Sequence, residues 1–251
     1  MPAVLGNAMP KSGSHLIIQV LEGLTDLGAF VNPGFPPVNR REDNTKHGDA
    51  ATLAEVRAMQ PGDIRYGYLH AVEPFISAVT GAGRATIFMY RDPRDWVVSQ
   101  VFYATDMHEG HMLHEYYNAL PTVEARIRAA IEGVPAKANA GVTAPSVVER
   151  YSHYIGWLDM PDVLCLRFED LILQREPAIG RILDYLAQRG FTPQVDRTHA
   201  IDRLAQGIAP KKSGTFRKGK PGNWREHFTP ANQRLFNDVA GELAAKLGYD
   251  E

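Results

Sequence analysis

The feature that most constrains the fold of this chain is a short turn near its N-terminus, which joins an apolar segment to an amphipathic one. Residues 3–9 are mostly apolar and predict a buried strand. Residues 16–27 repeat leucine, isoleucine and valine at helical spacing, and Gly28 supplies a stop signal. Backbone N–H groups and the positive end of the helix dipole converge at such a junction, which predicts an anion site. We call it the Lys11 turn, and it comprises Met9, Pro10, Lys11, Ser12, Gly13, Ser14 and His15.

The side chains of the Lys11 turn favour a phosphate-like group. Lys11 adds a point charge, and Ser12 and Ser14 add hydroxyl donors. The turn is not a Walker-type phosphate loop, because that motif has a glycine directly before its lysine and this chain has Pro10 there. Since proline carries no N–H, one donor for a nucleotide phosphate is missing. The turn therefore suits one compact anion better than a triphosphate.

Composition indicates a globular α/β protein with a single domain over residues 1–251. The chain has 44% hydrophobic and 22% charged residues, and its length allows a sizeable core. A net charge of −2 gives no general attraction to nucleic acid or to an anionic membrane, so we expect neither partner. The single cysteine, Cys165, allows no internal disulfide, and its place in an apolar segment favours a packing role. No signal peptide precedes the first strand and no apolar run approaches membrane-spanning length, so we expect a cytoplasmic protein.

Segments with strand character alternate with helical patterns along the rest of the chain. Strands are predicted at residues 64–70, 85–90 and 163–168, and helices at residues 53–59, 123–131, 147–158, 177–188 and 230–247. Such alternation predicts a central parallel sheet with helices on both faces and ligands at the carboxyl ends of its strands. Two stretches rich in glycine and proline, residues 29–63 and 104–149, interrupt the pattern and are candidates for an acceptor pocket or lid.

Arg91 and Ser99 follow the predicted strand at residues 85–90 and lie eight residues apart. Between them, Asp92 is suited to cap a helix and Pro93 to occupy its first position. A surface arginine and a helical serine would explain either residue alone. Because this end of a parallel sheet is the ligand edge, the pair favours a second anion-binding element.

A basic, glycine-rich segment near the C-terminus, residues 207–225, is a third element that we call the strap. Between residues 211 and 225 it has six basic residues and no acidic one. A solvated loop is the simpler interpretation of such a run. The alternative is a segment whose side chains and backbone N–H groups close on a phosphate, and the residues concerned are Phe216, Arg217, Lys218 and Gly219.

Histidines supply the candidates for acid–base chemistry. His70 ends a predicted strand and is the candidate general base, although a histidine in such a place often has a structural role. His108, His111 and His114 follow at steps of three, which cannot place all of them on one helical face. Since no cysteine or carboxylate cluster completes a metal site, we expect no metal requirement. His108 and Glu109 are reserve candidates for the base.

Together these motifs resemble those of the cytosolic sulfotransferases, which use 3′-phosphoadenosine 5′-phosphosulfate (PAPS) as the donor. The Lys11 turn resembles the family's Pro-Lys-Ser-Gly-Thr-Thr-Trp loop. Residues 91–99 match a family arginine and serine in order and spacing, and residues 216–224 match its Arg-Lys-Gly segment. His70 lies in the interval that holds the family's catalytic histidine. The motifs occur in family order from residue 3 to about residue 229.

The resemblance implies a role for each matching residue. The 5′-phosphosulfate would be held by Lys11, Ser12, Gly13, Ser14 and His15, and Lys11 would also stabilise the leaving oxygen. The 3′-phosphate would be bound by Arg91, Ser99, Phe216, Arg217, Lys218 and Gly219. His70 would remove the acceptor proton. The acceptor-pocket candidates are Tyr68, His108, Glu109 and His111.

The chain departs from the family pattern at several positions. Leu16 stands where the family has a tryptophan that stacks on adenine, and Phe168 replaces a tyrosine found near the adenine. His15 replaces a threonine, Tyr68 replaces a lysine, and Asn223 replaces an aspartate of the strap. The family's dimer signature, Lys-x-x-x-Thr-Val, is missing after the strap, so the oligomeric state stays open.

The fold implied is a P-loop-like α/β sulfotransferase fold. The activity implied is in-line transfer of the sulfuryl group of PAPS to a hydroxyl or amine of a small-molecule acceptor, with release of 3′-phosphoadenosine 5′-phosphate (PAP). Two alternatives stay open. An ATP-dependent small-molecule or nucleoside kinase of related fold would need Mg²⁺, yet no convincing Walker-B aspartate follows an apolar strand. The other alternative is a nucleotide-binding regulator without turnover.

Overall fold

The structure is a computed structural model that describes the chain except for residues 33–36, 42, 44, 140, 210–218 and 250–251. The chain divides into two compact units, which are described in turn. The first unit comprises Met1–Tyr90 and His153–Ser213, and the second comprises Arg91–Ser152 and Gly214–Glu251. A single domain over residues 1–251 stays a prediction.

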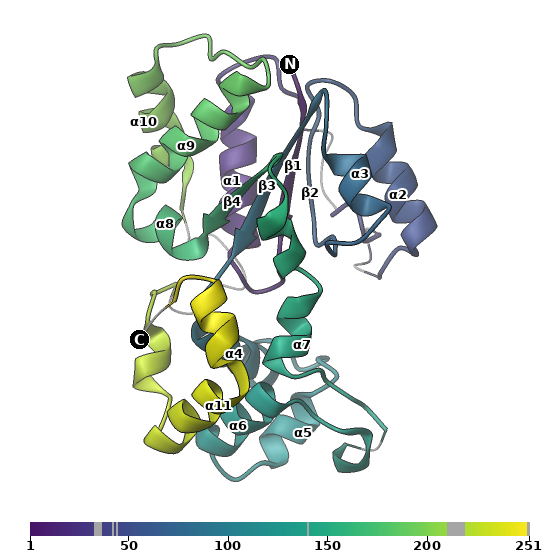
Figure 1. The fold of residues 1–251 in the computed structure, drawn as a ribbon, viewed down its shortest axis with the longest axis vertical. Helices are drawn as coiled ribbons and strands as arrows, with labels where there is room; N and C mark the ends of the chain where they lie inside the picture. Colours follow the sequence, from purple (N-terminus) through teal and green to yellow (C-terminus); the bar gives the residue numbers. More distant parts are fainter. Residues whose placement is uncertain (33–36, 42, 44, 140, 210–218, 250–251) are drawn as a thin grey trace. The chain divides into compact units, whose positions relative to one another are not determined.

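The first unit is built on a parallel sheet (Figure 1). Its described strands are β1 (Ala3–Ala8), β2 (Ile64–Gly67), β3 (Arg84–Tyr90) and β4 (Val163–Arg167), in the order β2-β1-β3-β4. β1 pairs in parallel with β2 and β3, and β3 pairs in parallel with β4. Every residue of β1 is buried, which is typical of a strand inside a parallel sheet. The predicted central parallel sheet is therefore confirmed.

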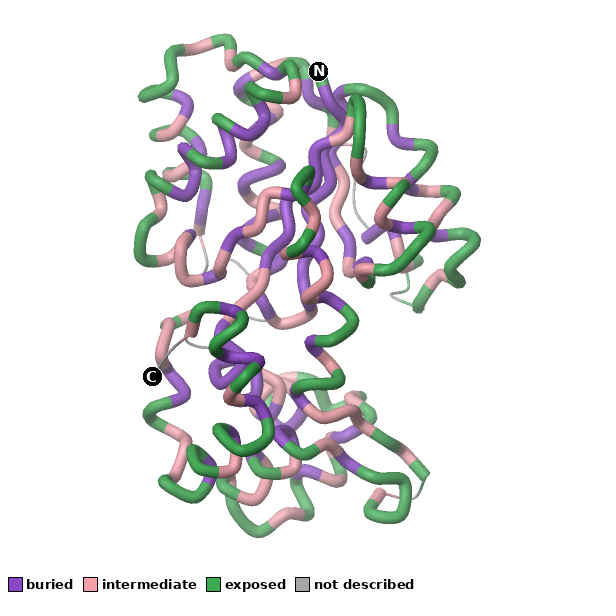
Figure 2. The backbone as a smooth tube through the Cα atoms, in the orientation of Figure 1, coloured by how far each residue is buried: buried purple, intermediate pink, exposed green. Residues whose placement is uncertain are grey.

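Helices cover both faces of this sheet (Figure 1). One side carries α1 (Ser14–Leu24), α8 (Phe168–Leu173), α9 (Arg175–Gln188) and α10 (Arg197–Gly207), and the other carries α2 (Asp49–Ala58) and α3 (Phe75–Val79). The main core joins the sheet to α1, α9 and α10, with buried side chains such as Ile17, Leu21, Ile87, Leu166 and Ile182. Figure 2 shows buried strands running through the middle of the unit. α10 has no counterpart among the predicted helices.

The predicted end of the first helix is wrong. α1 ends at Leu24 and does not reach Gly28, because the N–H of Thr25 bonds to the Glu22 carbonyl at 3.1 Å and closes a tighter turn. Gly28 serves packing instead of termination. A Cβ at this position would lie 2.6 Å from the ring of Phe191. Glycine is therefore needed at residue 28 because Phe191, which is distant in the sequence, packs closely against it.

Two predicted strand ends are also wrong. β2 ends at Gly67 and not at His70, because the Leu69 backbone bonds to the side chain of Asn7 and not to a neighbouring strand. β4 ends at Arg167, whose N–H bonds to the Asp170 carboxylate at 3.2 Å and starts α8. In both places a side chain replaces the ladder partner and ends the strand.

The second unit is helical in the part of the chain that the structure describes. Its elements are α4 (Pro93–Phe102), η1 (Tyr103–Met107), α5 (His114–Ala119), α6 (Val123–Glu132), η2 (Ala136–Ala138), α7 (Val147–Ser152), η5 (Asn223–Glu226) and α11 (Pro230–Lys246). α6 packs against α4 and α11, and α11 also packs against α7. The helices predicted at residues 123–131 and 230–247 are confirmed.

The helix predicted at residues 147–158 is wrong in its length. α7 ends at Ser152, and a separate 3₁₀ turn, η3 (Ile155–Asp159), follows in the first unit. The carbonyl of His153 accepts a hydrogen bond from the Ala71 N–H at 2.8 Å, so it bonds outside the helix. The N–H of Trp157 bonds to the Tyr154 carbonyl, three residues back, and not to the His153 carbonyl, four residues back. This bond gives the tighter 3₁₀ turn.

Candidate functional site

The Lys11 turn joins β1 to α1 in the first unit, as predicted. The Met9 N–H bonds to the Met89 carbonyl of β3, and the Ser12 N–H bonds back to the Met9 carbonyl, each at 3.1 Å. Lys11 has a φ of +68°, and among the described residues it is the one non-glycine residue with a positive φ. Because an L-residue adopts this conformation at a cost, a lysine there indicates a functional constraint on the backbone.

The end of the turn leaves polar groups available to an anion. Gly13 caps α1 with a φ of +93° and no side-chain hydrogen bond, so the first-turn N–H groups lack a side-chain cap. The Ser12 side chain is buried at 0% exposure, and its Oγ has no hydrogen-bond partner in the described part of the chain. An uncapped helix N-terminus beside an unpartnered buried hydroxyl and a lysine fits a compact oxyanion.

Ser14 and His15 complete the turn. The Tyr68 hydroxyl donates to Ser14 Oγ at 3.2 Å, which places this acceptor-pocket candidate beside the Lys11 turn. Partial burial, and then the positive charge of Lys11, lower the pKa of His15. His15 is therefore neutral at neutral pH, and Lys11 is the cation of the turn.

His70 lies three residues beyond β2, where two aromatic rings hold its exposed imidazole. The ring of His153 stacks on it with centroids 4.7 Å apart and planes 12° apart. The ring of Tyr154 meets it edge-on at 5.0 Å. His70 is thus oriented by a segment that is distant in the sequence, and no sequence motif marked His153 or Tyr154 as its neighbours.

The backbone beside His70 is held by buried polar side chains. Asn7 accepts from the Leu69 N–H at 2.7 Å and donates to the Leu69 carbonyl at 3.1 Å. Trp157 donates its indole N–H to the same carbonyl at 2.9 Å. Because Asn7 belongs to β1, the strand that leads into the Lys11 turn also fixes the segment of the candidate base. Asn7 is a polar residue in an otherwise apolar strand, and that signal could have identified it.

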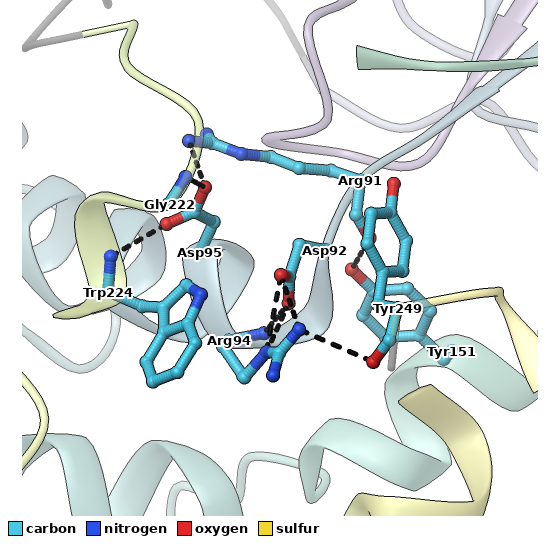
Figure 3. Close-up of polar contacts among 8 residues, drawn as sticks. All are labelled: Arg91, Asp92, Arg94, Asp95, Tyr151, Gly222, Trp224 and Tyr249. Carbon is cyan, nitrogen blue, oxygen red and sulfur yellow. Dashed lines mark hydrogen bonds and ion pairs between the residues drawn. The ribbon is translucent and has the colours of Figure 1, made fainter. Parts of the chain in front are cut away.

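The second unit positions Arg91, which directly follows β3 (Figure 3). The Tyr151 hydroxyl donates to the Arg91 carbonyl at 2.8 Å. The Arg91 guanidinium forms an ion pair with Asp95 at 3.5 Å, and both side chains are largely buried. Ser99 is partly buried on α4, four residues beyond Asp95. Arg91 and Ser99 are therefore each four residues from Asp95, Arg91 just before the helix and Ser99 within it.

Only part of the strap lies among the described residues. Phe216, Arg217 and Lys218 lie outside them, and Gly219 has a φ of +57°. Farther along, the N–H groups of Gly222 and Trp224 both donate to the Asp95 carboxylate at 2.8 Å (Figure 3). The structure thus brings the end of the strap to the start of α4, near Arg91.

Asp92 and Arg94 build the frame of this region. Asp92 caps α4 by accepting from the Arg94 N–H at 2.9 Å, and Pro93 occupies the first turn, as predicted. The Arg94 guanidinium forms an ion pair with Asp92 at 2.9 Å and lies over the Trp224 ring, 4.4 Å from its centroid. It also donates to the Tyr249 carbonyl at 3.3 Å. These contacts join α4 to the C-terminal segment.

The other acceptor-pocket candidates lie in the second unit, around η1 and α5. Glu109 and His111 line an open pocket together with Met112, His114, Glu115 and Asn139. The ring of His108 lies 5.5 Å from that of Tyr103, which also meets His111 at 5.8 Å. Their role in acceptor binding stays a prediction.

The described part of the chain lacks two kinds of feature. No group of three or more histidine, cysteine, aspartate or glutamate side chains gathers there as a metal site. Among the same residues, no helix is long and apolar enough to cross a membrane.

A parallel sheet with a tight turn and an uncapped helix N-terminus between its first strand and first helix defines a P-loop-like α/β protein. Within that class, the chain belongs to the sulfotransferase domain family, whose model matches residues 84–248. A curated relative, Sulfotransferase 6B1 of Danio rerio, is 25% identical over 116 residues. This match covers 40% of the chain and spans 39% of the relative's length.

Solved sulfotransferase structures share the fold. Mouse sulfotransferase SULT7A1, in complex with PAP, matches 99% of this chain and 88% of its own, with a TM-score of 0.68 and 17% identity. Retinol dehydratase, in complex with androsterone and PAP, matches 98% of this chain and 80% of its own, with a TM-score of 0.61 and 15% identity. The predicted fold class is confirmed.

Proposed function

We propose that this protein transfers the sulfuryl group of PAPS to a hydroxyl or amine of a small-molecule acceptor and releases PAP. The observation that carries the proposal is the Lys11 turn. It combines a lysine at φ +68°, an uncapped helix N-terminus and a buried, unpartnered Ser12 hydroxyl. Membership of the sulfotransferase family supports the proposal, as do related folds solved with PAP.

The Lys11 turn would hold the 5′-phosphosulfate. Its donors are the Lys11 ammonium, the Ser12 and Ser14 hydroxyls, and the N–H groups at Gly13 and His15. PAPS supplies the sulfuryl group and a phosphate leaving group. The lowered pKa of His15 leaves Lys11 as the positive charge that stabilises the leaving oxygen. Tyr68 orients the Ser14 hydroxyl through its 3.2 Å hydrogen bond.

Arg91 and Ser99, together with Phe216, Arg217, Lys218 and Gly219 of the strap, would bind the 3′-phosphate. Arginine suits this task because its planar donors match phosphate oxygens in pairs. The ion pair with Asp95 at 3.5 Å restricts the Arg91 side chain before a nucleotide arrives. Ser99 adds a hydroxyl from α4, one helical turn beyond Asp95.

His70 would act as the general base. Its imidazole is exposed and is held in one orientation by His153 and Tyr154, which suits proton transfer from an acceptor. His108 or Glu109 is the reserve candidate. The acceptor would contact Tyr68, His108, Glu109 and His111. Retinol dehydratase was solved with androsterone and with retinol, and small alcohols of this kind are suitable first acceptors to screen.

The organisation of the whole protein is part of the proposal. The family match at residues 84–248 includes residues of both units, which supports one sulfotransferase domain over residues 1–251. Residues 29–63 and 104–149 would shape the acceptor pocket, and residues 207–225 would close on the nucleotide. We propose a cytoplasmic enzyme without a metal requirement or a nucleic-acid partner.

Calorimetry with PAP, AMP and ATP tests the nucleotide assignment. If two basic elements serve the 3′-phosphate, PAP should bind at least about tenfold more tightly than AMP, because each charge-assisted hydrogen bond contributes about 1.5–3 kcal/mol. Equal affinities for PAP and AMP would contradict the assignment, and preferred binding of ATP with Mg²⁺ would favour a kinase. A screen of acceptors with PAPS, following PAP release, then tests turnover and separates an enzyme from a regulator.

A further inference from the structure

Asp95 is a buried carboxylate among the residues proposed to bind the 3′-phosphate (Figure 3). It lies in the first turn of α4, and its side chain has 0% exposure. Arg91 precedes it by four residues, just before the helix, and Ser99 follows it by four within α4. None of the roles proposed above uses this carboxylate as more than a partner of Arg91.

Three donors from two segments meet at this carboxylate. Oδ2 accepts from the Gly222 N–H at 2.8 Å and lies 3.5 Å from Arg91 Nη2, while Oδ1 accepts from the Trp224 N–H at 2.8 Å. The two backbone donors belong to the end of the strap, 127 and 129 residues away in the sequence. One carboxylate thus joins Arg91 to the backbone of residues 222–224.

The link is specific because a buried carboxylate needs its donors. Burial raises the pKa of Asp95, whereas the charge of Arg91 and the N–H of Trp224 lower it. Losing any donor would leave a buried acceptor unsatisfied. Gly222 meets the requirement with a φ of +75°, and a Cβ there would lie 3.0 Å from the guanidinium of Arg225. Glycine at 222 therefore lets the backbone N–H reach Asp95.

The same contacts reduce the repulsion between Asp95 and a phosphate. An isolated carboxylate next to residues that bind a phosphate would repel that phosphate. Here two N–H groups and a guanidinium compensate the charge of Asp95. The same contacts restrict Arg91 on one side and the backbone of residues 222–224 on the other. Such advance ordering lowers the entropic cost of binding.

We propose that Asp95 is a positioning residue for the 3′-phosphate: it holds the Arg91 guanidinium and anchors the backbone of residues 222–224, which follows the proposed phosphate ligand Gly219. The inference rests on the proposed function. It differs from a purely structural role in one measurable respect: the loss of Asp95 should reduce discrimination between PAP and AMP, which differ only in the 3′-phosphate.

The test compares Asp95→Asn with Asp92→Asn. Both variants exchange a carboxylate for an amide of equal size at the start of α4, Asp92 at its N-cap and Asp95 in its first turn. In Asp95→Asn the amide nitrogen cannot accept from Gly222, and the ion pair with Arg91 is lost. Asp92→Asn weakens the pair with Arg94 but retains a good helix cap. Gly222→Ala disrupts the Asp95 contact from the strap and removes no buried charge.

Two readouts are measured on the full chain. The first is the ratio of PAP to AMP affinity by calorimetry. The second is hydrogen exchange without ligand, by mass spectrometry on peptides covering residues 219–226. Asp95→Asn and Gly222→Ala should lower the affinity ratio by tenfold or more and accelerate exchange, while Asp92→Asn leaves the ratio within about twofold of the unaltered chain.

Each outcome decides the proposal. A ratio unchanged in Asp95→Asn and Gly222→Ala, or lowered equally in Asp92→Asn, would overturn the positioning role. Faster exchange with an unchanged ratio would show that Asp95 holds the strap only for stability. An unaltered chain that binds PAP and AMP equally would overturn the 3′-phosphate assignment of the proposed function itself. The positioning role would fail with it, although exchange would still report the link to the strap.

Discussion

At the scale of the residue, Lys11 and His70 are proposed to act on opposite sides of the transferred group. Lys11 would act on the nucleotide, because its charge would stabilise the leaving oxygen. His70 would act on the acceptor, and no contact with the nucleotide is proposed for it. The two residues lie in one unit, where β1 leads into the Lys11 turn and its Asn7 holds the backbone next to His70. Their substitutions should therefore differ in kind.

Lys11→Ala should weaken PAP binding and lower turnover by about 10²–10³-fold, the usual effect of removing a stabilising charge or donor. His70→Ala should leave PAP affinity nearly unchanged and slow transfer to a hydroxyl acceptor by about 10²–10⁴-fold. Calorimetry and single-turnover rates with the acceptor from the screen separate the two effects. Full turnover of His70→Ala on a hydroxyl would move the base to His108 or Glu109.

His153 should support His70 through ring stacking. His153→Ala removes the ring at 4.7 Å and should lower kcat about two- to tenfold, because an aromatic pair contributes about 0.5–1.5 kcal/mol. His153→Phe is the matched control, since it keeps a flat ring and should restore most of kcat. PAP affinity should not change in either variant. If alanine and phenylalanine reduce kcat equally, the imidazole of His153 has chemistry of its own and stacking is not its role.

At the scale of the element, the strand–turn–helix formed by β1, the Lys11 turn and α1 depends on one glycine. A Cβ at Gly13 would lie 2.6 Å from the Phe168 ring and 3.1 Å from Met89, and the backbone φ is +93°. Neither the ring nor the left-handed backbone accommodates alanine well. The conformation of the anion site therefore belongs to the whole element and not to the lysine alone.

Gly13→Ala should lower the free energy of unfolding by about 1–3 kcal/mol. Gly241→Ala is the contrasting control. Gly241 lies inside α11 with nothing within 4 Å of its Cβ position, so alanine should raise the free energy of unfolding by about 0.5–1 kcal/mol. Urea denaturation followed by circular dichroism measures both. Equal stability of Gly13→Ala and the unaltered chain would mean that the turn adopts another conformation.

At the scale of the whole molecule, the partly buried thiol of Cys165 and phenol of Tyr66 determine how the free energy of unfolding changes at alkaline pH. Burial raises the pKa of Cys165 to about 12, and the thiol lies 3.5 Å from the Trp157 carbonyl. Burial also raises the pKa of Tyr66 to about 12. In the unfolded chain these groups ionise near their ordinary values of 9.0 and 10.0. The folded state therefore binds more protons than the unfolded state between these limits.

The contribution of these groups to the free energy of unfolding is therefore fully present below about pH 9. It falls as the pH rises towards 12, by at most about 1.4 kcal/mol per pH unit for one group. Cys165→Ala should remove the decrease in the free energy of unfolding that begins near pH 9. The decrease caused by Tyr66 above pH 10 should remain. Denaturation curves from pH 7 to 11 measure the slopes. A thiol-independent slope between pH 9 and 10 would contradict the burial of Cys165.

The sequence by itself determined the elements whose signals are local. The apolar run before Lys11, the glycine at 13 and the helical spacing after it define β1, the turn and α1, because each needs only neighbours within a few residues. The cap at Asp92 and Pro93 defines the start of α4 for the same reason. The parallel sheet followed from the alternation of strands and helices.

The tertiary structure alone decided which distant residues meet. Asp95 holds N–H groups 127 and 129 residues away, and His70 stacks on His153 from another segment. Hydrogen bonds between distant segments also end β2 at Gly67, through Asn7 and Leu69, and α7 at Ser152, through Ala71 and His153. The spacing of residue types in the sequence shows which side chains share a face of one strand or one helix. The contacts between distant segments depend instead on how packing arranges whole elements. Their partners were therefore not readable from the sequence.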